Sequence, residues 1–196
     1  MTPVEKIERL MLRRESGWWE KLCETIPALT ALTDTPQPPE YHAEGDVAIH
    51  TRLAIEACPK DCDPDLLWVA LLHDVGKPAT TQQNEQGRIT AYGHAELGAK
   101  ITGRILSNLE MPVQRCERII WAIRHHTFHH SWQLQKSDVP SKKQHRYLTD
   151  PKFPLLLEFL RIDSLASQGN PAGMETYDFY KELWESISQQ RAQSNS

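Results

Sequence analysis

Two adjacent residues, His73 and Asp74, interrupt an apolar stretch of the chain at residues 70–77. Other residues with metal-binding side chains occur before and after this pair: His50, His94, His125, His126 and Asp163. Imidazole nitrogens and carboxylate oxygens are the ligands that borderline and hard divalent cations prefer. These residue types therefore predict a metal site, and a carboxylate shared between two ions would make it a two-metal hydrolytic centre.

The surroundings of the His-Asp pair strengthen this prediction. Residues 65–74 are apolar on all sides of a helix, which is typical of a buried helix, and Pro64 after Asp63 suits its first turn. A buried carboxylate without a partner is costly, and the run holds no basic residue before Lys77. Alone, the pair would be a satisfied core histidine and a capping or ion-paired aspartate. A metal ion would satisfy both side chains at once.

Two further polar residues lie among apolar neighbours on predicted helices. His50 follows Val47 and Ile49 on a helix that Asp46 can cap at its N-terminus, and Asp163 lies between Ile162 and residues 164–166. Alone, each would be a core histidine or half of an ion pair. Their burial costs are offset together if His50, His73, Asp74 and Asp163 converge on one cation.

The remaining histidines predict a second ion beside the first. His94 opens a predicted helix, and the run at residues 125–130 contains two histidine pairs with i, i+4 spacing, which can hold zinc on one helix face. We favour His125 or His126 as the ligand, because the helical pattern is intact up to that point. His129 and His130 are expected to be exposed. The aspartate of the central pair would bridge the two ions.

The candidate catalytic residues are Asp74 and Lys77. Asp74 would orient the attacking water, and would accept a proton only where metal binding leaves one of its oxygens free. A cation beside a metal pair suits a phosphate oxygen, although Lys77 could instead meet the dipole at a helix C-terminus. Arg161 and Arg124 are weaker candidates for substrate binding.

Composition narrows the class of protein. The 196 residues suffice for one sizeable core, and 39% hydrophobic with 24% charged residues is typical of a globular domain. A net charge of −4 does not indicate a broad nucleic-acid surface. Cys58 and Cys62 lack the spacing of a zinc knuckle, which favours a structural role. No signal peptide and no run of about 18 apolar residues is found, so a cytoplasmic protein is expected.

Hydrophobic spacing predicts helices and no series of strands, which gives an all-α fold in one compact bundle. The helix at residues 4–24 contains Gly17, which would bend or break it. The other expected helices are 46–57, 65–74, 93–109, 112–126, 153–167 and 174–190. Residues 78–92 predict a polar loop with a short hairpin, and residues 131–152 are polar with little periodicity. The single domain divides into an N-terminal extension (1–32), a proline-rich connector (33–40), a core (46–167) and a C-terminal helix (174–190).

The ordered motifs resemble the HD-domain superfamily of metal-dependent phosphohydrolases. They are His50-Thr51, the block at residues 73–77, Gly93-His94-Ala95-Glu96, His125-His126 and Asp163. The resemblance implies the HD fold, first-metal ligands His50, His73, Asp74 and Asp163, and a second site like that of binuclear members. The chain lacks a Gly-Tyr-Pro block, so a cyclic-di-GMP enzyme is not expected.

Within that superfamily, residues 70–77 and 92–112 resemble the HD domain of bacterial tRNA nucleotidyltransferases and poly(A) polymerases. That domain is associated with phosphatase and 2′,3′-cyclic phosphodiesterase activity. The chain departs from those proteins, because it has no room for a nucleotidyltransferase domain and lacks its joint Gly-Ser and Asp-x-Asp signature.

The leading hypothesis is hydrolysis of a phosphate mono- or diester, with a nucleotide or 2′,3′-cyclic nucleotide as substrate. The cofactor would be one or two divalent ions among Mn, Ni, Co, Zn, Fe and Mg. Two alternatives stay open: a mixed-valence di-iron oxygenase, and a non-catalytic module that binds a nucleotide or an RNA end. The expected partner is a small phosphorylated molecule, with nucleic acid only at a 3′ end and no membrane; the oligomeric state is open.

Overall fold

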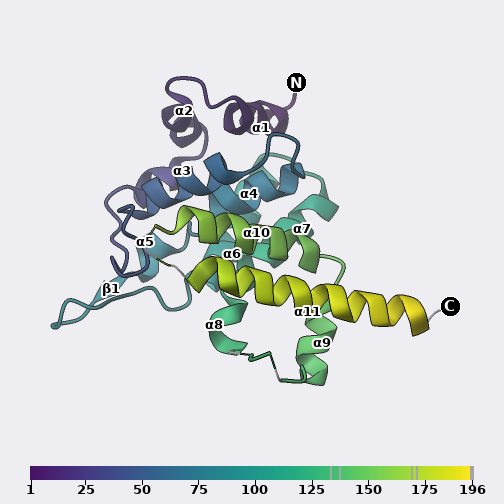
Figure 1. The fold of residues 1–196 in the computed structure, drawn as a ribbon. Helices are drawn as coiled ribbons and strands as arrows, with labels where there is room; N and C mark the ends of the chain where they lie inside the picture. Colours follow the sequence, from purple (N-terminus) through teal and green to yellow (C-terminus); the bar gives the residue numbers. More distant parts are fainter. Residues whose placement is uncertain (133, 137, 169, 171, 195–196) are drawn as a thin grey trace.

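The computed structural model describes residues 1–132, 134–136, 138–168, 170 and 172–194, and its regular secondary structure is helical apart from one short hairpin (Figure 1). The elements are α1 (Pro3–Arg13), α2 (Trp18–Thr25), the 3₁₀ helix η1 (Pro27–Leu32), α3 (Val47–Ala57), α4 (Pro64–Leu72), α5 (Lys77–Thr80), β1 (Gln82–Gln83), β2 (Ile89–Thr90), α6 (His94–Asn108), α7 (Val113–His125), α8 (Phe128–Trp132), α9 (Lys142–Leu148), α10 (Phe153–Ala166) and α11 (Ala172–Ser194). The prediction of an all-α fold is confirmed. Within the described ranges, no helix is both long and apolar enough to cross a membrane.

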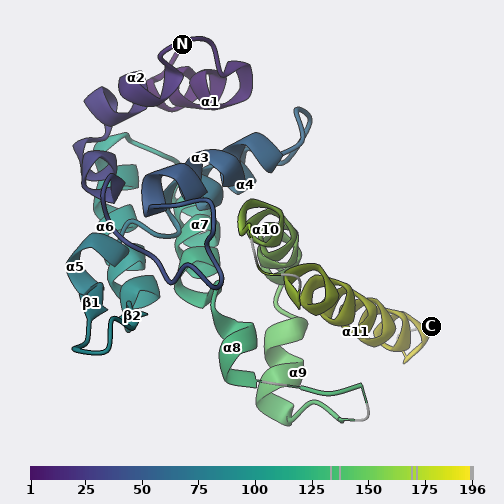
Figure 2. The same ribbon diagram turned by 60° about the vertical axis from the view of Figure 1, so that its left-hand side comes forward.

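The helices are arranged around α4. Figures 1 and 2 place α1 and α2 at one end of the molecule and α8 and α9 at the other, with α3, α4, α6, α7 and α10 between them. Helix α4 packs against α3, α7 and α10, and also against α1. Eight of its nine residues are buried, so the prediction of a buried central helix is confirmed.

Helix α4 also fixes where the His-Asp pair lies. Asp63 caps its N-terminus by accepting from the backbone N–H of Asp65, and Pro64 occupies the first helical position. The helix ends at Leu72, two residues earlier than predicted, and residues 73–76 form a turn. His73 and Asp74 therefore lie just beyond the buried C-terminal end of α4, and their side chains are in the interior.

The predicted helix at residues 4–24 is two helices. Arg14 adopts the left-handed conformation (φ 49°) at the end of α1, and Gly17 does the same (φ 75°) before α2. Glycine adopts that conformation at no steric cost, so the break lies where the sequence indicated. Helix α1 is held on the core by Glu8, which accepts from Trp68 and pairs with Arg115.

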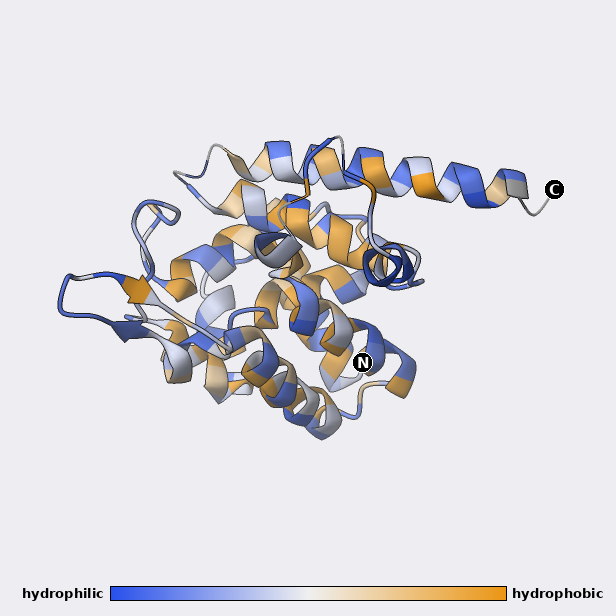
Figure 3. Cartoon of the chain, turned by 90° about the horizontal axis from the view of Figure 1, so that it is seen from below, coloured by the Kyte–Doolittle hydropathy of each residue, from blue (hydrophilic) through white to orange (hydrophobic). Residues whose placement is uncertain are grey.

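Helix α10 joins two apolar clusters. Leu155, Phe159 and Ile162 belong to the larger cluster around α4, whereas Phe153 and Leu156 belong to a smaller one with α8, α9 and α11. Because both faces of α10 are covered, its sequence is apolar nearly all round. Figure 3 shows hydrophobic residues concentrated on the helices in the middle of the molecule and a mixture along α11.

Two predicted loops contain helices. The loop at 78–92 has the expected hairpin, with β1 antiparallel to β2, but α5 comes before it. The stretch at 131–152 contains the end of α8 and all of α9, although its residues 133 and 137 lie outside the described part. Helix α9 begins with a capping box between Ser141 and Gln144 and buries Leu148. Helices this short have too few turns for their apolar spacing to be recognised.

Candidate metal centre

Six candidate ligands meet where five elements converge. His50 comes from α3, and His73 with Asp74 from the turn after α4. The other three come from the first residue of α6, the end of α7 and the fourth turn of α10: His94, His126 and Asp163. The packing of α3, α7 and α10 against α4 brings these candidate ligands together in space, although they are far apart in the sequence.

The first group of ligands is compact. His50 Nε2 lies 2.9 Å from Asp163 Oδ1. His73 Nε2 lies 3.1 Å from Asp74 Oδ2 and 3.7 Å from Asp163 Oδ1. Ligand atoms of His50, His73 and Asp74 all lie within 4.8 Å of one another. These separations suit four ligand atoms around one cation.

The second group shares Asp74 with the first. His94 Nε2 lies 3.5 Å from Asp74 Oδ1, and His126 Nε2 lies 3.8 Å from the same oxygen. The two Nε2 atoms are 3.0 Å apart. Asp74 therefore turns Oδ2 toward His73 and Oδ1 toward His94 and His126, the arrangement that a bridging carboxylate needs.

The histidine tautomers are set by hydrogen bonds on the far side of each ring. His73, His94 and His126 all bring Nδ1 to a main-chain oxygen three residues earlier, at 2.7–3.0 Å; the oxygens belong to Ala70, Ala91 and Ile123. A carbonyl can only accept, so Nδ1 carries a proton, and in the neutral ring Nε2 keeps its lone pair. Such bonds orient metal-binding histidines.

Several atoms of the cluster are buried without hydrogen-bond partners. Among the described residues these include His73 Nε2 and both carboxylate oxygens of Asp74. Lys77 Nζ does lie 2.7 Å from Asp74 Oδ2 as an ion pair, but its direction does not satisfy hydrogen-bond geometry. Buried polar atoms are almost always satisfied. Together with the neighbouring side chains, these atoms belong to a cluster of two carboxylates and four imidazoles, which is a donor set that fits a divalent cation.

The electrostatics keep most ligands in metal-binding form. Burial alone would raise the pKa of Asp74, but His73 and Lys77 outweigh it and hold that pKa well below its usual range. Burial lowers the pKa of His126 to about 3, and it also lowers the pKa of His94. At neutral pH this aspartate is charged and these two histidines are neutral, as ligands must be.

His50 differs from the other histidines. Burial would lower its pKa, but hydrogen bonds with Asp163 and with Glu44 raise it to about 9. Without a cation, His50 is therefore an imidazolium between two carboxylates. A cation that binds Nε2 must displace this proton, so its affinity increases with pH.

The protein comparisons agree with this geometry. A family model described as HD domain matches residues 41–165, more than half of the chain. The chain belongs to the HD domain family. The HD domain indicates the superfamily of metal-dependent hydrolases, so the resemblance stated from the motifs is confirmed.

Similar curated proteins are named Multifunctional CCA protein. That of Teredinibacter turnerae is 32% identical over 118 residues, which are 60% of this chain and 27% of the relative. That of Hahella chejuensis is 30% identical over 110 residues, 56% and 25% of the two chains. One from Acinetobacter baumannii is 31% identical over 102 residues, 52% and 24%. The part of this chain that matches these relatives therefore corresponds to about a quarter of their length.

His125 and His126 are adjacent in the sequence, but their side chains lie in different surroundings. His126 lies with His94 in the second ligand group. His125 turns away: its Nδ1 contacts the carbonyl oxygen of Trp121 at 2.7 Å, and its ring packs on Trp121 and Tyr147. Of the two alternatives left open by the sequence, the geometry favours His126 as the ligand.

The other histidines and the arginines are placed differently from one another. His130 is exposed, as expected, but His129 is only partly exposed, and its Nδ1 is buried without a partner among the described residues. The expectation for His129 was wrong because α8 packs onto the smaller apolar cluster through Phe128. Arg124 pairs with Glu96, and Arg161 pairs with Glu158. Neither arginine forms an ion pair with the metal ligands in the described part.

Lys77 is the positively charged side chain closest to the candidate metal ligands. Its Nζ lies 2.7 Å from Asp74 Oδ2 and donates to Gln37 Oε1 at 2.7 Å. Gln37 comes from the proline-rich connector and was not identified from the sequence. Glu44, which holds His50, was also missed. A single glutamine or glutamate in a loop carries no periodic signal.

Gly76 of the HD motif is required by packing. Its backbone conformation is helical (φ −84°) and open to any residue, so no strain explains it. A Cβ at Gly76 would lie 2.2 Å from the carbonyl oxygen of His94 and 2.7 Å from the backbone nitrogen of Gly98. Glycine thus lets the turn after α4 touch the start of α6 and brings His94 to Asp74.

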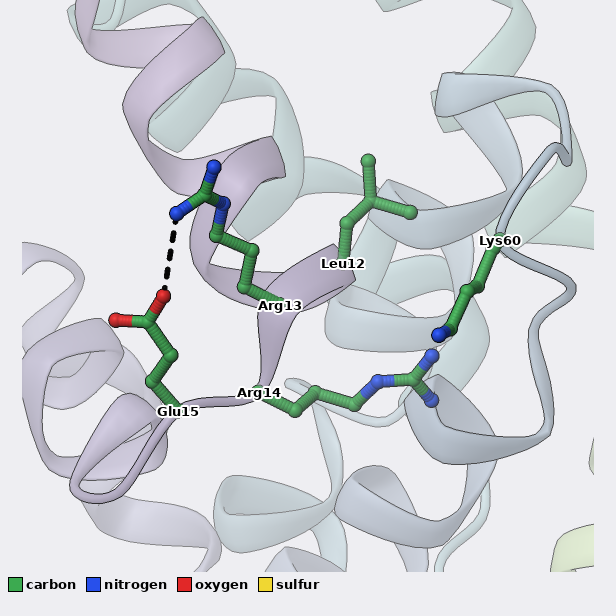
Figure 4. A pocket seen from close by; sticks show the side chains of 5 residues that line it. All are labelled: Leu12, Arg13, Arg14, Glu15 and Lys60. Atoms are coloured by element: carbon green, nitrogen blue, oxygen red, sulfur yellow. Dashed lines mark hydrogen bonds and ion pairs between the residues drawn. The ribbon is translucent and has the colours of Figure 1, made fainter.

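A hollow at the N-terminal helices is separate from the metal centre. It is lined by Leu12, Arg13, Arg14, Glu15 and Lys60 (Figure 4). Arg13 pairs with Glu15, and Arg14 donates to the carbonyl oxygens of Ile55 and Glu56 at the end of α3. Cations at a helix C-terminus stabilise it, so these contacts attach the N-terminal segment to the core.

Proposed function

We propose that this HD domain is a metal-dependent phosphohydrolase that cleaves a phosphate mono- or diester of a nucleotide, including 2′,3′-cyclic nucleotides. The observation that carries the proposal is the position of Asp74. One of its oxygens faces each ligand group, and Lys77 lies 2.7 Å from the carboxylate. A bridging carboxylate with a lysine beside it suits a phosphate group in a two-metal site.

Two sets of residues would hold the cations. His50, His73, Asp74 and Asp163 would bind the first, and Asp74, His94 and His126 the second. Divalent cations in such a site lower the pKa of water and offset the negative charge of a phosphate group.

The protein residues determine access and charge. The side chains of His50, His73 and His126 are at most 5% exposed and close the inner side of the site. Asp163 and His94 are 23% and 16% exposed, and Lys77 is 12% exposed. A phosphate group therefore approaches along the side formed by Asp163, His94 and Lys77, where Nζ can donate to a non-bridging oxygen.

The choice of a nucleotide is supported by the relatives. They are named Multifunctional CCA protein, and the part that matches this chain is about a quarter of each. The net charge of −4 favours a small substrate or a strand end over an extended nucleic acid.

Elemental analysis comes first, on protein purified without a chelator or a histidine tag. We expect one or two transition ions per chain, lost in the Asp74→Ala and His73→Ala variants while helicity stays near wild type. The metal-loaded protein should then hydrolyse p-nitrophenyl phosphate, its bis ester or a 2′,3′-cyclic nucleotide, and both variants should be inactive.

Three outcomes would contradict the proposal. Full activity in either variant would reject the mechanism. Bound iron with oxygen consumption and a mixed-valence signal would indicate the oxygenase. A protein that retains no manganese, nickel, cobalt or zinc after soaking would indicate a binding module without catalysis.

A further inference from the structure

A buried glutamate lies behind the first ligand group. Glu44 belongs to the loop before α3, and its side chain is only 1% exposed. It forms a compact cluster with His42 and His50, whose ligand-type atoms all lie within 4.8 Å of one another. Glu44 lies outside both ligand groups, so direct coordination of either ion does not explain why its carboxylate is buried.

The contacts of Glu44 link two elements that carry ligands. Its Oε1 lies 2.8 Å from Nδ1 of His50 and 2.8 Å from Nδ1 of His42. Its Oε2 accepts from the backbone N–H of Gln168 at 2.8 Å, and the N–H of Ala43 donates to the Gln168 carbonyl oxygen at 2.7 Å. Gln168 comes shortly after α10, the helix that carries Asp163, so Glu44 connects the His50 ring to the end of that helix.

These contacts determine which nitrogen of His50 is available. The ionised carboxylate of Glu44 can only accept, so Nδ1 of His50 carries the proton that faces Glu44. Nε2 of the same ring faces Asp163 Oδ1, 2.9 Å away. The other three histidines of the centre use backbone carbonyls for the same purpose. His50 alone uses a carboxylate, and that carboxylate reaches it from a loop outside the helices.

The cluster does not fit a third metal ion. A cation bound to His42, Glu44 and His50 would need Nδ1 of His50, while the first ligand group needs Nε2 of the same ring. That ring would have to lose both protons, and imidazole binds metals as the neutral ring. Distances of 2.8 Å at both rings are ordinary hydrogen-bond lengths.

We propose that Glu44 is a positioning residue of the metal centre, which orients His50 and ties it to the helix that carries Asp163. The inference rests on the proposed metal site and adds a residue that does not touch the ion. Replacing a hydrogen-bond partner of a metal-binding histidine typically weakens metal binding about 10- to 100-fold.

The test measures metal affinity, not turnover. Manganese and cobalt are titrated calorimetrically into metal-free wild type, Glu44→Ala and Glu44→Gln, and the visible spectrum of the cobalt form is recorded. We expect binding of the first ion to weaken about 10- to 100-fold in Glu44→Ala, with a changed cobalt spectrum. Glu44→Gln should be partly restored, since its amide oxygen can accept from His50, whereas its amide nitrogen cannot accept from Gln168.

Glu40→Ala is the matched control, because Glu40 is an exposed carboxylate four residues before Glu44 and should leave affinity and spectrum unchanged. Circular dichroism identifies a variant that does not fold, in which case Glu44→Gln decides. Wild-type affinity and spectrum in a folded Glu44→Ala variant would overturn this inference and leave the proposed function standing. The inference would also be overturned if wild type bound a third ion and Glu44→Gln lost that ion. A wild-type protein that binds neither ion would overturn the proposed function as well.

Discussion

Replacing Gly76 by alanine should separate the second ligand group from the first. The added Cβ would lie 2.2 Å from the carbonyl oxygen of His94, and ordinary contact begins at 3.4 Å. The atoms in the way are backbone, so the start of α6 must move by about 1 Å or more, at a cost of about 1–3 kcal/mol. His94 Nε2 is 3.5 Å from Asp74 Oδ1, and a movement of that size removes His94 from shared coordination.

The assay is chemical unfolding together with calorimetric metal titration. Gly76→Ala should lower the free energy of unfolding and reduce the bound ions from two to one. Gly103→Ala, on α6, is the control, because its Cβ would meet only the tip of Ile120 at 3.5 Å. It should stabilise the protein by about 0.4–1 kcal/mol and keep both ions. If Gly76→Ala is as stable as wild type and binds both ions, the packing argument is wrong.

Three further predictions concern the site. His126→Ala should abolish binding of the second ion in calorimetry, and His125→Ala should keep it; the reverse result would assign the ligand to His125. Lys77→Met should lower kcat on a phosphodiester about 100-fold or more while ions remain bound, and unchanged kcat would remove Lys77 from substrate binding. Burial and the neighbouring His130 lower the pKa of His129 to about 4 from 6.5. The unfolded chain then takes up a proton that the folded chain does not, so His129 alone should contribute a loss of at most about 2 kcal/mol of the stability of the metal-free protein between pH 7 and pH 5. In His129→Gln, Tm should depend less on pH, and an identical slope would contradict the shift.

The sequence identified the candidate ligands that lie in regular, buried helices. His50 and Asp163 were recognisable because each is a polar residue in an apolar helical pattern, and burial requires a partner for each. His73 and Asp74 were recognisable for the same reason at the end of α4. The structure brings these four side chains together.

The sequence could not distinguish His125 from His126 for a geometric reason. Neighbouring residues on a helix point about 100° apart, and both follow Ile123 at the end of α7, where the apolar pattern stops. The choice depends on how α7 packs against α6, which is a tertiary contact. The difference appears only in space, where His126 reaches His94 and His125 packs on Trp121.

The connector shows a second limit of sequence reasoning. Its prolines correctly excluded a helix at residues 33–40, yet nothing in its pattern shows which side chains turn inward. Gln37 is 6% exposed and accepts from Lys77, and Glu44, a few residues later, holds His50. Loop residues have no period from which a buried face can be read.

The candidate metal centre, a cluster of histidines and aspartates, lies at the end of the buried apolar helix α4, and each depends on the other. Helix α4 is covered by α3, α7 and α10, and these helices also carry His50, His126 and Asp163. The apolar contacts that bury α4 therefore fix the spacing of the ligands. Without a cation, this packing leaves Asp74 with unsatisfied oxygens in the interior, which costs stability. A cation that satisfies them should therefore stabilise the fold in addition to its proposed role in catalysis.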